Sequence, residues 1–105
     1  MPWRGGANML KANPKTSWNS NECMPTVAAT AYVDESAMII GDVRIGEEVY
    51  VGPVASLRAD EANPIIIGDK CNIQDSVVFH GLMGSSINLG KQISIAHGAV
   101  IHGPM

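Results

Sequence analysis

Aliphatic residues recur at every sixth position along most of the chain. The period resumes after two gaps of ten and includes eleven positions: Val33, Ile39, Ile45, Val51, Leu57, Ile67, Ile73, Phe79, Leu89, Ile95 and Ile101. An amphipathic strand alternates every two residues and a helix repeats every 3.6, so neither produces a sustained period of six. A hexapeptide repeat is typical of a parallel β-helix, in which each repeat forms one short strand and one corner. The pattern therefore predicts an all-β protein of this architecture.

Smaller residues accompany the repeat. A small or β-branched residue lies four positions after most of the repeated residues, at Ala37, Val43, Val49, Ala55, Cys71, Val77, Ile93 and Ala99. Glycine directly follows four of the repeated aliphatic residues, at Gly46, Gly52, Gly68 and Gly90. We expect the repeated side chains to fill the interior, the smaller ones to fit near corners, and glycine to permit tight backbone geometry. Cys71 therefore has a packing role, and its spacing from Cys23 fits no zinc motif.

Three repeats form one triangular coil, so the repeats divide the chain into successive coils. These cover residues 33–50, 51–72 and 73–94, and a fourth begins at residue 95, giving a parallel β-helix of about three to four coils. Both long gaps fall at the same corner, within residues 59–66 and 81–88. Residues 1–26 contain scattered Gly, Pro, Asn and Ser, and predict an irregular N-terminal arm before a β-helix domain at residues 27–105.

Length and charge narrow the class of protein. A chain of 105 residues forms one domain, and a net charge of -3 without a run of Lys or Arg argues against a nucleic-acid partner. No apolar stretch is long enough to span a membrane, and the N-terminus lacks the apolar segment of a secretory signal. We therefore expect a cytoplasmic protein that has neither a nucleic acid nor a membrane as a partner.

One column of outward-facing residues contains two of the three histidines. Stacking the coils places the repeated residues in three columns: Val33, Val51, Ile73 and Ile95 in the first, Ile39, Leu57, Phe79 and Ile101 in the second, and Ile45, Ile67 and Leu89 in the third. Arg58, His80 and His102 follow successive residues of the second column and are separated by 22 positions, so they should stack on one outer face. Neighbouring strands lie about 4.8 Å apart, and imidazoles at that separation can share an ion about 2.0 to 2.1 Å from each nitrogen. His80 and His102 are thus a candidate half of a metal site, the alternative being two solvent-exposed histidines.

The third histidine belongs to a different face. His97 lies two positions after Ile95 in the first column, so one chain should direct it away from His102. A threefold oligomer would bring the first face of one subunit against the second face of the next, and His97 would then complete a three-histidine site. Asp75 lies beneath His97, with Gln74 beside it. An alternative role for Arg58, Asp60 and Asp75 is a salt-bridge network that only holds subunits together.

Three imidazoles with one open position are typical of catalytic rather than structural zinc sites. A divalent ion bound in this way lowers the pKa of a water ligand far enough to generate hydroxide at neutral pH. The amide of Gln74 could hydrogen-bond the reacting oxygen, since it offers both a donor and an acceptor. Glu61, at the first inserted corner, could relay the proton, although a loop carboxylate is more often simply solvated.

Four segments together resemble the γ-class carbonic anhydrases and the related carboxysomal scaffold domain. They are residues 56–61 (SLRADE), 72–75 (NIQD), 78–80 (VFH) and 94–104 (SIAHGAVIHGP). The resemblance extends from about residue 26 to the C-terminus. It implies a homotrimeric left-handed β-helix that converts CO2 and bicarbonate, with zinc, or alternatively iron or cobalt, between subunits.

The resemblance also implies roles for individual residues. His80 and His102 would come from one subunit and His97 from its neighbour, while Arg58 and Asp60 would tie subunits together. Further residues that match the family pattern are Gln74, near the metal-bound solvent, Asn72 and Asp75, its hydrogen-bonding neighbours, and Glu61, a carboxylate implicated in proton transfer.

The sequence departs from the family pattern in two respects. Family members continue for several more coils, whereas this chain ends at Met105, which suggests a C-terminal truncation. Met83 stands where some members have a second carboxylate that shuttles protons. Two alternatives to a carbonic anhydrase therefore stay open: a non-catalytic trimeric metal-binding scaffold or truncated remnant, and a hexapeptide acyltransferase with a lone histidine base and a coenzyme-A groove. Three histidines in matching register argue against the acyltransferase.

Overall fold

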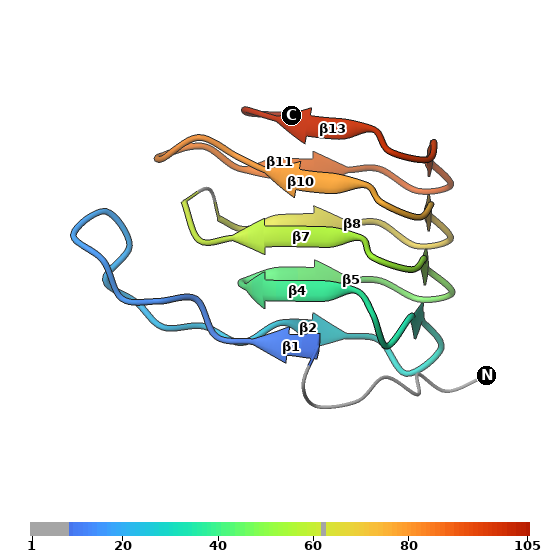
Figure 1. Ribbon diagram of the computed structural model, residues 1–105, viewed down its shortest axis with the longest axis horizontal. Coiled ribbons are helices and arrows are strands. Elements are labelled where there is room, and N and C mark those ends of the chain that lie inside the picture. Colours follow the sequence, from blue (N-terminus) through green and yellow to red (C-terminus); the bar gives the residue numbers. More distant parts are fainter. Residues whose placement is uncertain (1–8, 62) are drawn as a thin grey trace.

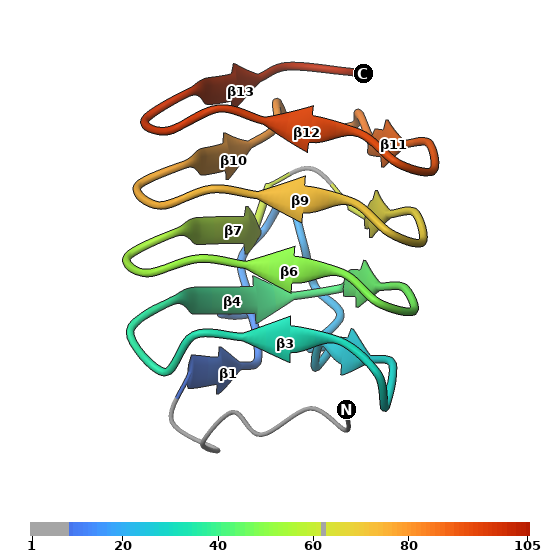
Figure 2. The ribbon, with the colours of Figure 1, turned by 90° about the vertical axis from the view of Figure 1, so that its right-hand side faces the viewer.

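The chain forms a three-sided solenoid of short parallel strands (Figure 1), as seen in a computed structural model that describes residues 9–61 and 63–105. Sheet A comprises β1 (Leu10–Lys11), β4 (Met38–Gly41), β7 (Ser56–Ala59), β10 (Val78–His80) and β13 (Val100–His102). Sheet B comprises β2 (Thr26–Val27), β5 (Val43–Ile45), β8 (Ile65–Ile67) and β11 (Ile87–Leu89). Sheet C, which faces the viewer in Figure 2, comprises β3 (Tyr32–Val33), β6 (Tyr50–Val51), β9 (Asn72–Ile73) and β12 (Ser94–Ile95).

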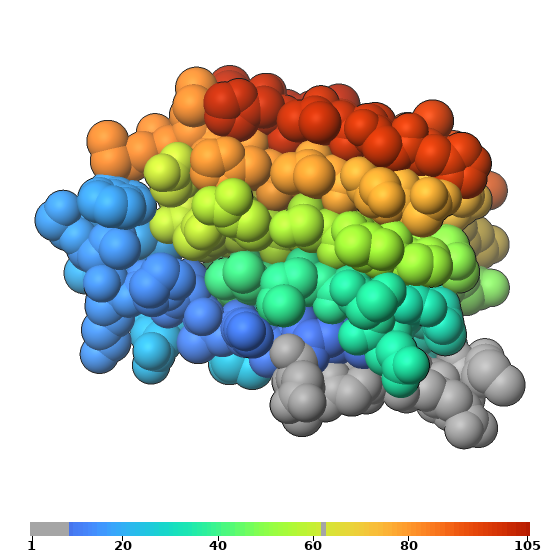
Figure 3. Space-filling model, viewed as in Figure 1, coloured from blue at the N-terminus to red at the C-terminus, as the bar shows by residue number. Residues whose placement is uncertain are grey.

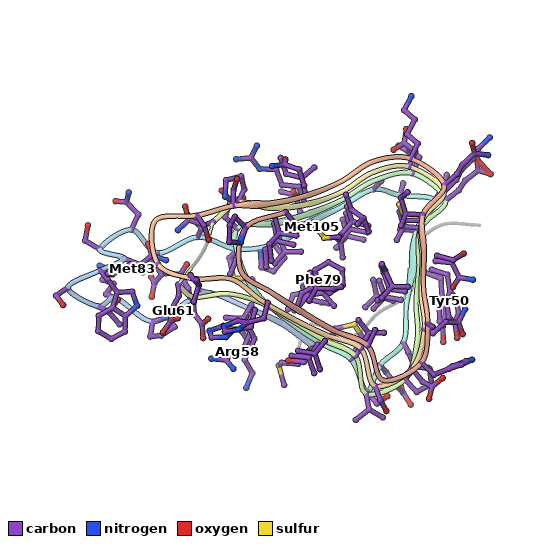
Figure 4. The ribbon with its side chains drawn as sticks, turned by 90° about the horizontal axis from the view of Figure 1, so that it is seen from above. Tyr50, Arg58, Glu61, Phe79, Met83 and Met105 are labelled. Atoms are coloured by element: carbon purple, nitrogen blue, oxygen red, sulfur yellow. The ribbon has the colours of Figure 1, made fainter. Side chains whose placement is uncertain are left out.

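The solenoid is left-handed. In Figure 4 the molecule is seen from the C-terminal end, and the chain passes clockwise from Tyr50 on sheet C through Arg58 on sheet A to Glu61 at the next corner. Successive coils rise toward the viewer along this path, because the C-terminus lies uppermost in Figure 1. Clockwise travel combined with a rise toward the viewer defines a left-handed winding. The predicted fold class is thus confirmed at the level of the single chain.

The strand registers reproduce the three predicted columns. In sheet A, Leu57 pairs with Ile39 on one side and Phe79 on the other, and Phe79 pairs in turn with Ile101. The columns of sheets B and C pair in the same way, through Ile45, Ile67 and Leu89 and through Val33, Val51, Ile73 and Ile95. Nearly all of these side chains are buried, and Phe79 lies inside the triangle (Figure 4). Stacked apolar side chains therefore hold the coils together.

Several corners require a left-handed backbone. The left-handed backbone is adopted by non-glycine residues at Glu48, Val54, Lys70, Ser76 and Gln92, with φ between 55° and 62°. Such a conformation costs about 1 to 2 kcal/mol per residue, and hydrogen bonds between stacked corners offset it, as from Lys70 N to the Glu47 carbonyl at 2.8 Å.

The glycines that directly follow the repeated aliphatic residues allow neighbouring coils to approach each other closely. A Cβ atom on Gly68 would lie 2.7 Å from the carbonyl carbon of Gly90 in the next coil, which is well inside van der Waals contact. Similar crowding surrounds Gly46 and Gly52. Gly90 itself has no atom within 4 Å of the equivalent point, so this crowding applies where another coil lies above.

The described part of the expected N-terminal arm includes a strand. Leu10 pairs with Ile39, so β1 adds a fifth strand to sheet A, and Met9 is buried in the core. The buried Asn13 side chain secures the following loop, since its Oδ1 accepts from Cys23 N and its Nδ2 donates to the Asn21 carbonyl, both at 2.8 Å. Residues 1–8 of the expected arm lie outside the described residues.

The connection between β1 and β2 projects from the same side as the two four-residue insertions (Figure 1). In Figure 3 its surface lies directly below that of the second insertion, which follows β10. Through residues 9–61 and 63–105, no helix is long and apolar enough to cross a membrane. The fold thus presents a loop-rich corner beside the outer face of sheet A.

Candidate metal centre

His80 and His102 stack on the outer face of sheet A. Pairing of β10 with β13 places the two residues directly opposite each other, and pairing of β7 with β10 places Arg58 below His80. The imidazole rings are nearly parallel, at an interplanar angle of 9° and a centroid separation of 5.2 Å. The predicted ladder is therefore confirmed as a register, and two imidazoles are held about one strand spacing apart on one face.

Two carboxylates approach His80 from the first inserted corner. Its Nε2 lies 3.2 Å from Glu61 Oε2 and 4.0 Å from Asp60 Oδ1. Arg58 donates to Asp60 Oδ2 from Nε at 3.2 Å and from Nη2 at 3.0 Å. Figure 4 shows Arg58 and Glu61 on the same edge of the triangle. The insertion after β7 therefore brings acidic groups to the histidine of the next coil.

Two atoms in this cluster are buried without a hydrogen-bond partner among the described residues. They are His80 Nε2 and Asp60 Oδ1. Glu61 is near enough to His80 for an ion pair if the imidazole is protonated, but the contact lacks hydrogen-bond geometry. Leaving a buried polar atom unsatisfied costs about 1 to 3 kcal/mol. A cation or a donor at this point would remove that cost, so the polar atoms present fit a metal ion.

His97 lies at the corner between sheets C and A, away from the stacked pair. Its Nδ1 contacts Asp75 Oδ1, and the side chains of His97 and Asp75 are 70% and 48% exposed. Across the described part of one chain, no three His, Cys, Asp or Glu side chains form a cluster able to hold a metal ion. The divergence of His97 from the other two histidines agrees with the sequence prediction.

Asn72 and Gln74 lie on sheet C rather than beside His80. Asn72 opens β9 on the outer face, and its Oδ1 is buried without a hydrogen-bond partner in the described chain. Gln74 follows β9, and its backbone N donates to the Ile95 carbonyl at 3.1 Å. Within the described residues, no side-chain hydrogen bond joins either amide to a histidine. A single chain therefore divides the predicted site residues between two faces.

The sequence reasoning missed an aromatic pair on sheet C. The rings of Tyr32 and Tyr50 stack with centroids 5.5 Å apart, and the two residues are 43% and 40% exposed. Tyr32 donates its hydroxyl proton to Asp34 at 3.1 Å, and this hydrogen bond raises the pKa of Tyr32. The sequence could have indicated this pair, because each tyrosine directly precedes a first-column residue, Val33 or Val51. This face also carries Asn72 in register with Tyr50.

The chain is similar in sequence to several proteins of known name. The chain is 37% identical over 114 residues to a carbonic anhydrase from Methanosarcina thermophila, a match that covers 90% of this chain and 46% of that protein. It is 41% identical over 103 residues to the carboxysome assembly protein CcmM of Nostoc, covering 89% of this chain and 19% of CcmM. No family model matches the sequence.

Other relatives share the repeat under different names. The carnitine operon protein CaiE of Escherichia coli is 44% identical over 80 residues, covering 76% of this chain and 40% of CaiE. A crystal structure of a hexapeptide transferase family protein from Anaplasma phagocytophilum superposes with a TM-score of 0.71 at 35% identity, covering 76% of this chain and 46% of that one. The chain thus spans less than half the length of each of these relatives. The chain therefore shares the hexapeptide-repeat β-helix fold of these proteins and is similar in sequence to γ-class carbonic anhydrase, CcmM and CaiE.

Proposed function

We propose that this protein is a homotrimer of the γ-carbonic anhydrase type that hydrates CO2 reversibly to bicarbonate at metal sites between subunits. The observation that carries the proposal is the parallel pair of His80 and His102, with Nε2 of His80 buried and lacking a hydrogen-bond partner in the described chain. Two imidazoles held in this way provide half of a metal site. The similarity to the carbonic anhydrase of Methanosarcina thermophila supports the choice of reaction.

A second subunit would supply the third ligand. Among the described residues of one chain, His97 forms no metal-binding cluster with the stacked pair, so a second subunit would have to bring its own His97 to the site. Apolar residues accompany the histidines on sheet A: Val78 is half-buried and pairs with Val100, which is 65% exposed. Apolar side chains gathered on an outer face favour contact with another protein. A threefold arrangement would cover this face and bring the neighbour's His97 corner to it.

Zinc is the proposed metal, with iron or cobalt as alternatives, because three imidazole nitrogens suit all three ions. When bound, the metal supplies a Lewis acid that makes water nucleophilic near neutral pH. Glu61 lies 3.2 Å from His80 Nε2 and its side chain is 36% exposed. It can therefore accept a proton within the site and release it to solvent.

The remaining polar residues would stabilise the subunit contact or orient the reacting oxygen. Arg58 and Asp60 pair at 3.0 Å and would fix the corner against the next subunit. The Gln74 amide would orient the reacting oxygen by hydrogen bonding, since it can both donate and accept. Asn72 Oδ1, which lacks a partner in the described residues, would in turn accept a hydrogen bond from Gln74.

The decisive measurement is metal content together with CO2 hydration. We expect the purified protein to have the mass of a trimer by native mass spectrometry and about one zinc per subunit. Hydration measured by stopped flow should disappear with a chelator and return when zinc is added. A metal-loaded trimer whose hydration rate equals that of free zinc would contradict the enzymatic proposal.

A non-catalytic scaffold is the second candidate, and the second inserted corner favours it. Residues 81–86 contain no acidic residue, and Met83 in this loop is 65% exposed. This loop therefore offers no second carboxylate for proton transfer beside Glu61. Full metal occupancy and trimer formation without hydration would support this role. Binding of acetyl coenzyme A in the absence of metal would instead favour an acyltransferase, the third alternative.

A further inference from the structure

We propose that Asp75 is a positioning residue that makes Nε2 the metal-binding nitrogen of His97. The proposal rests on the proposed function, because it takes His97 to be a metal ligand. The Asp75 carboxylate contacts Nδ1 of His97 from the coil below. An ionised carboxylate can only accept a hydrogen bond, so the neutral imidazole must carry its proton on Nδ1. Nε2 then keeps its lone pair and points away from the carboxylate.

The stacked corners enforce this contact. Asp75 and His97 each precede a residue with left-handed backbone, Ser76 at φ 60° and Gly98 at φ 71°. The backbone N of Gly98 donates to the Asp75 carbonyl at 3.0 Å, which ties one corner to the next. The two side chains therefore emerge from equivalent positions one coil apart. Their pairing follows from the coil repeat and does not require a second subunit.

Orientation is especially valuable at this position because His97 is exposed. Its side chain is 70% accessible, whereas that of His80 is 23% accessible and is held between the corner carboxylates and His102. An exposed imidazole would otherwise sample several rotamers and both neutral tautomers. A carboxylate that accepts from the second ring nitrogen fixes the tautomer and the ring orientation of a metal-binding histidine. Asp75 would thus prepare an exposed ligand that the neighbouring subunit's stacked pair requires.

The first test reads the tautomer directly, without metal. In the metal-free trimer labelled with 15N-histidine, long-range 1H–15N spectra should show His97 with its proton on Nδ1. Asp75→Ala should convert it to a mixture dominated by the Nε2-protonated form, which is the commoner form of an unconstrained imidazole. A wild-type His97 with its proton on Nε2 would overturn the proposal, whatever the protein's activity.

The second test reads zinc affinity by competition with a chromophoric chelator. We expect Asp75→Ala to weaken zinc binding about 10- to 100-fold. Asp75→Asn should retain most of the affinity, because the amide oxygen can still accept from Nδ1. Glu35→Ala is the matched control, since Glu35 is an exposed acid at the equivalent corner position of the first coil. Unchanged affinity in a trimeric Asp75→Ala variant would overturn the proposal.

The outcomes separate this inference from the proposed function. A wild-type trimer that binds no zinc would contradict the metal site, while the spectra would still show whether Asp75 sets the tautomer. If Asp75→Ala fails to assemble, the comparison moves to Asp75→Asn and to the wild-type spectrum. Equal zinc loss in Asp75→Asn, with the Nδ1-protonated tautomer retained, would assign Asp75 to subunit contacts only and would also overturn the proposal.

Discussion

The two histidine-bearing regions of this solenoid are organised in opposite ways. On sheet A, His80 and His102 are stacked by strand register, and His80 is partly enclosed by corner carboxylates. At the corner between sheets C and A, His97 is exposed and contacts the Asp75 carboxylate one coil below. The first region resembles a preassembled half-site and the second a prepared ligand. A site built from both would exist only where two chains meet.

The largest effect is expected from removing a member of the stacked pair. His102→Ala should abolish stoichiometric zinc binding, because a single histidine and the neighbour's His97 leave too few ligands. Metal analysis of the purified trimer checks this outcome. The fold should persist, since His102 lies outside the buried core and no core residue is altered. Retained stoichiometric zinc would contradict the role of the stacked pair.

Mixed trimers would test the division of the site between chains. His97→Ala alone should also lose zinc, but co-expression with His102→Ala should restore binding at those interfaces that combine the two intact halves. Random assembly predicts zinc at about a quarter of the interfaces. Native mass spectrometry of differently tagged subunits, with metal counted for each composition, checks this number. Zinc in neither mixed species would show that one chain supplies all of its own ligands.

The comparison also shows what could be predicted from sequence. The six-residue period of aliphatic residues predicted the three columns, and the two four-residue insertions predicted the register of Arg58, His80 and His102. These predictions succeeded because backbone pairing repeats from coil to coil. The sequence also placed Asp75 beneath His97, but the choice of Nδ1 as the contacting atom depends on rotamers.

Features outside the repeat could not be derived in the same way. The insertion that brings Glu61 to His80 is a loop whose path no periodicity specifies. The pairing of β1 with β4 escaped the prediction because Leu10 stands at no multiple of six from Ile39, and a loop held by Asn13 separates β1 from the first coil. The Tyr32–Tyr50 stack depends on ring orientation as well as register.

A moderate effect on turnover is expected from the carboxylate beside the stacked pair. Glu61→Gln should reduce CO2 hydration about 100-fold, which is within the usual range for loss of a proton-transfer group. Zinc content should stay at the wild-type level, because the metal is assigned to histidines. Raising the concentration of imidazole buffer should restore part of the rate by replacing the internal relay. Wild-type turnover of this variant at low buffer concentration would show that Glu61 is not the proton relay.

The smallest effect concerns the coil spacing on which both regions depend. Gly68→Ala places a Cβ about 2.7 Å from the Gly90 carbonyl carbon, so the two coils must separate slightly. Overpacking of this kind costs about 1 to 3 kcal/mol. Gly90→Ala is the matched control, because its Cβ would meet no atom within 4 Å. Urea unfolding should show a lower midpoint for Gly68→Ala alone. Since contacts in a solenoid are mainly between neighbouring coils, both variants should still bind zinc, and loss of zinc in a folded Gly68→Ala trimer would mean that the histidine register depends on the opposite corner.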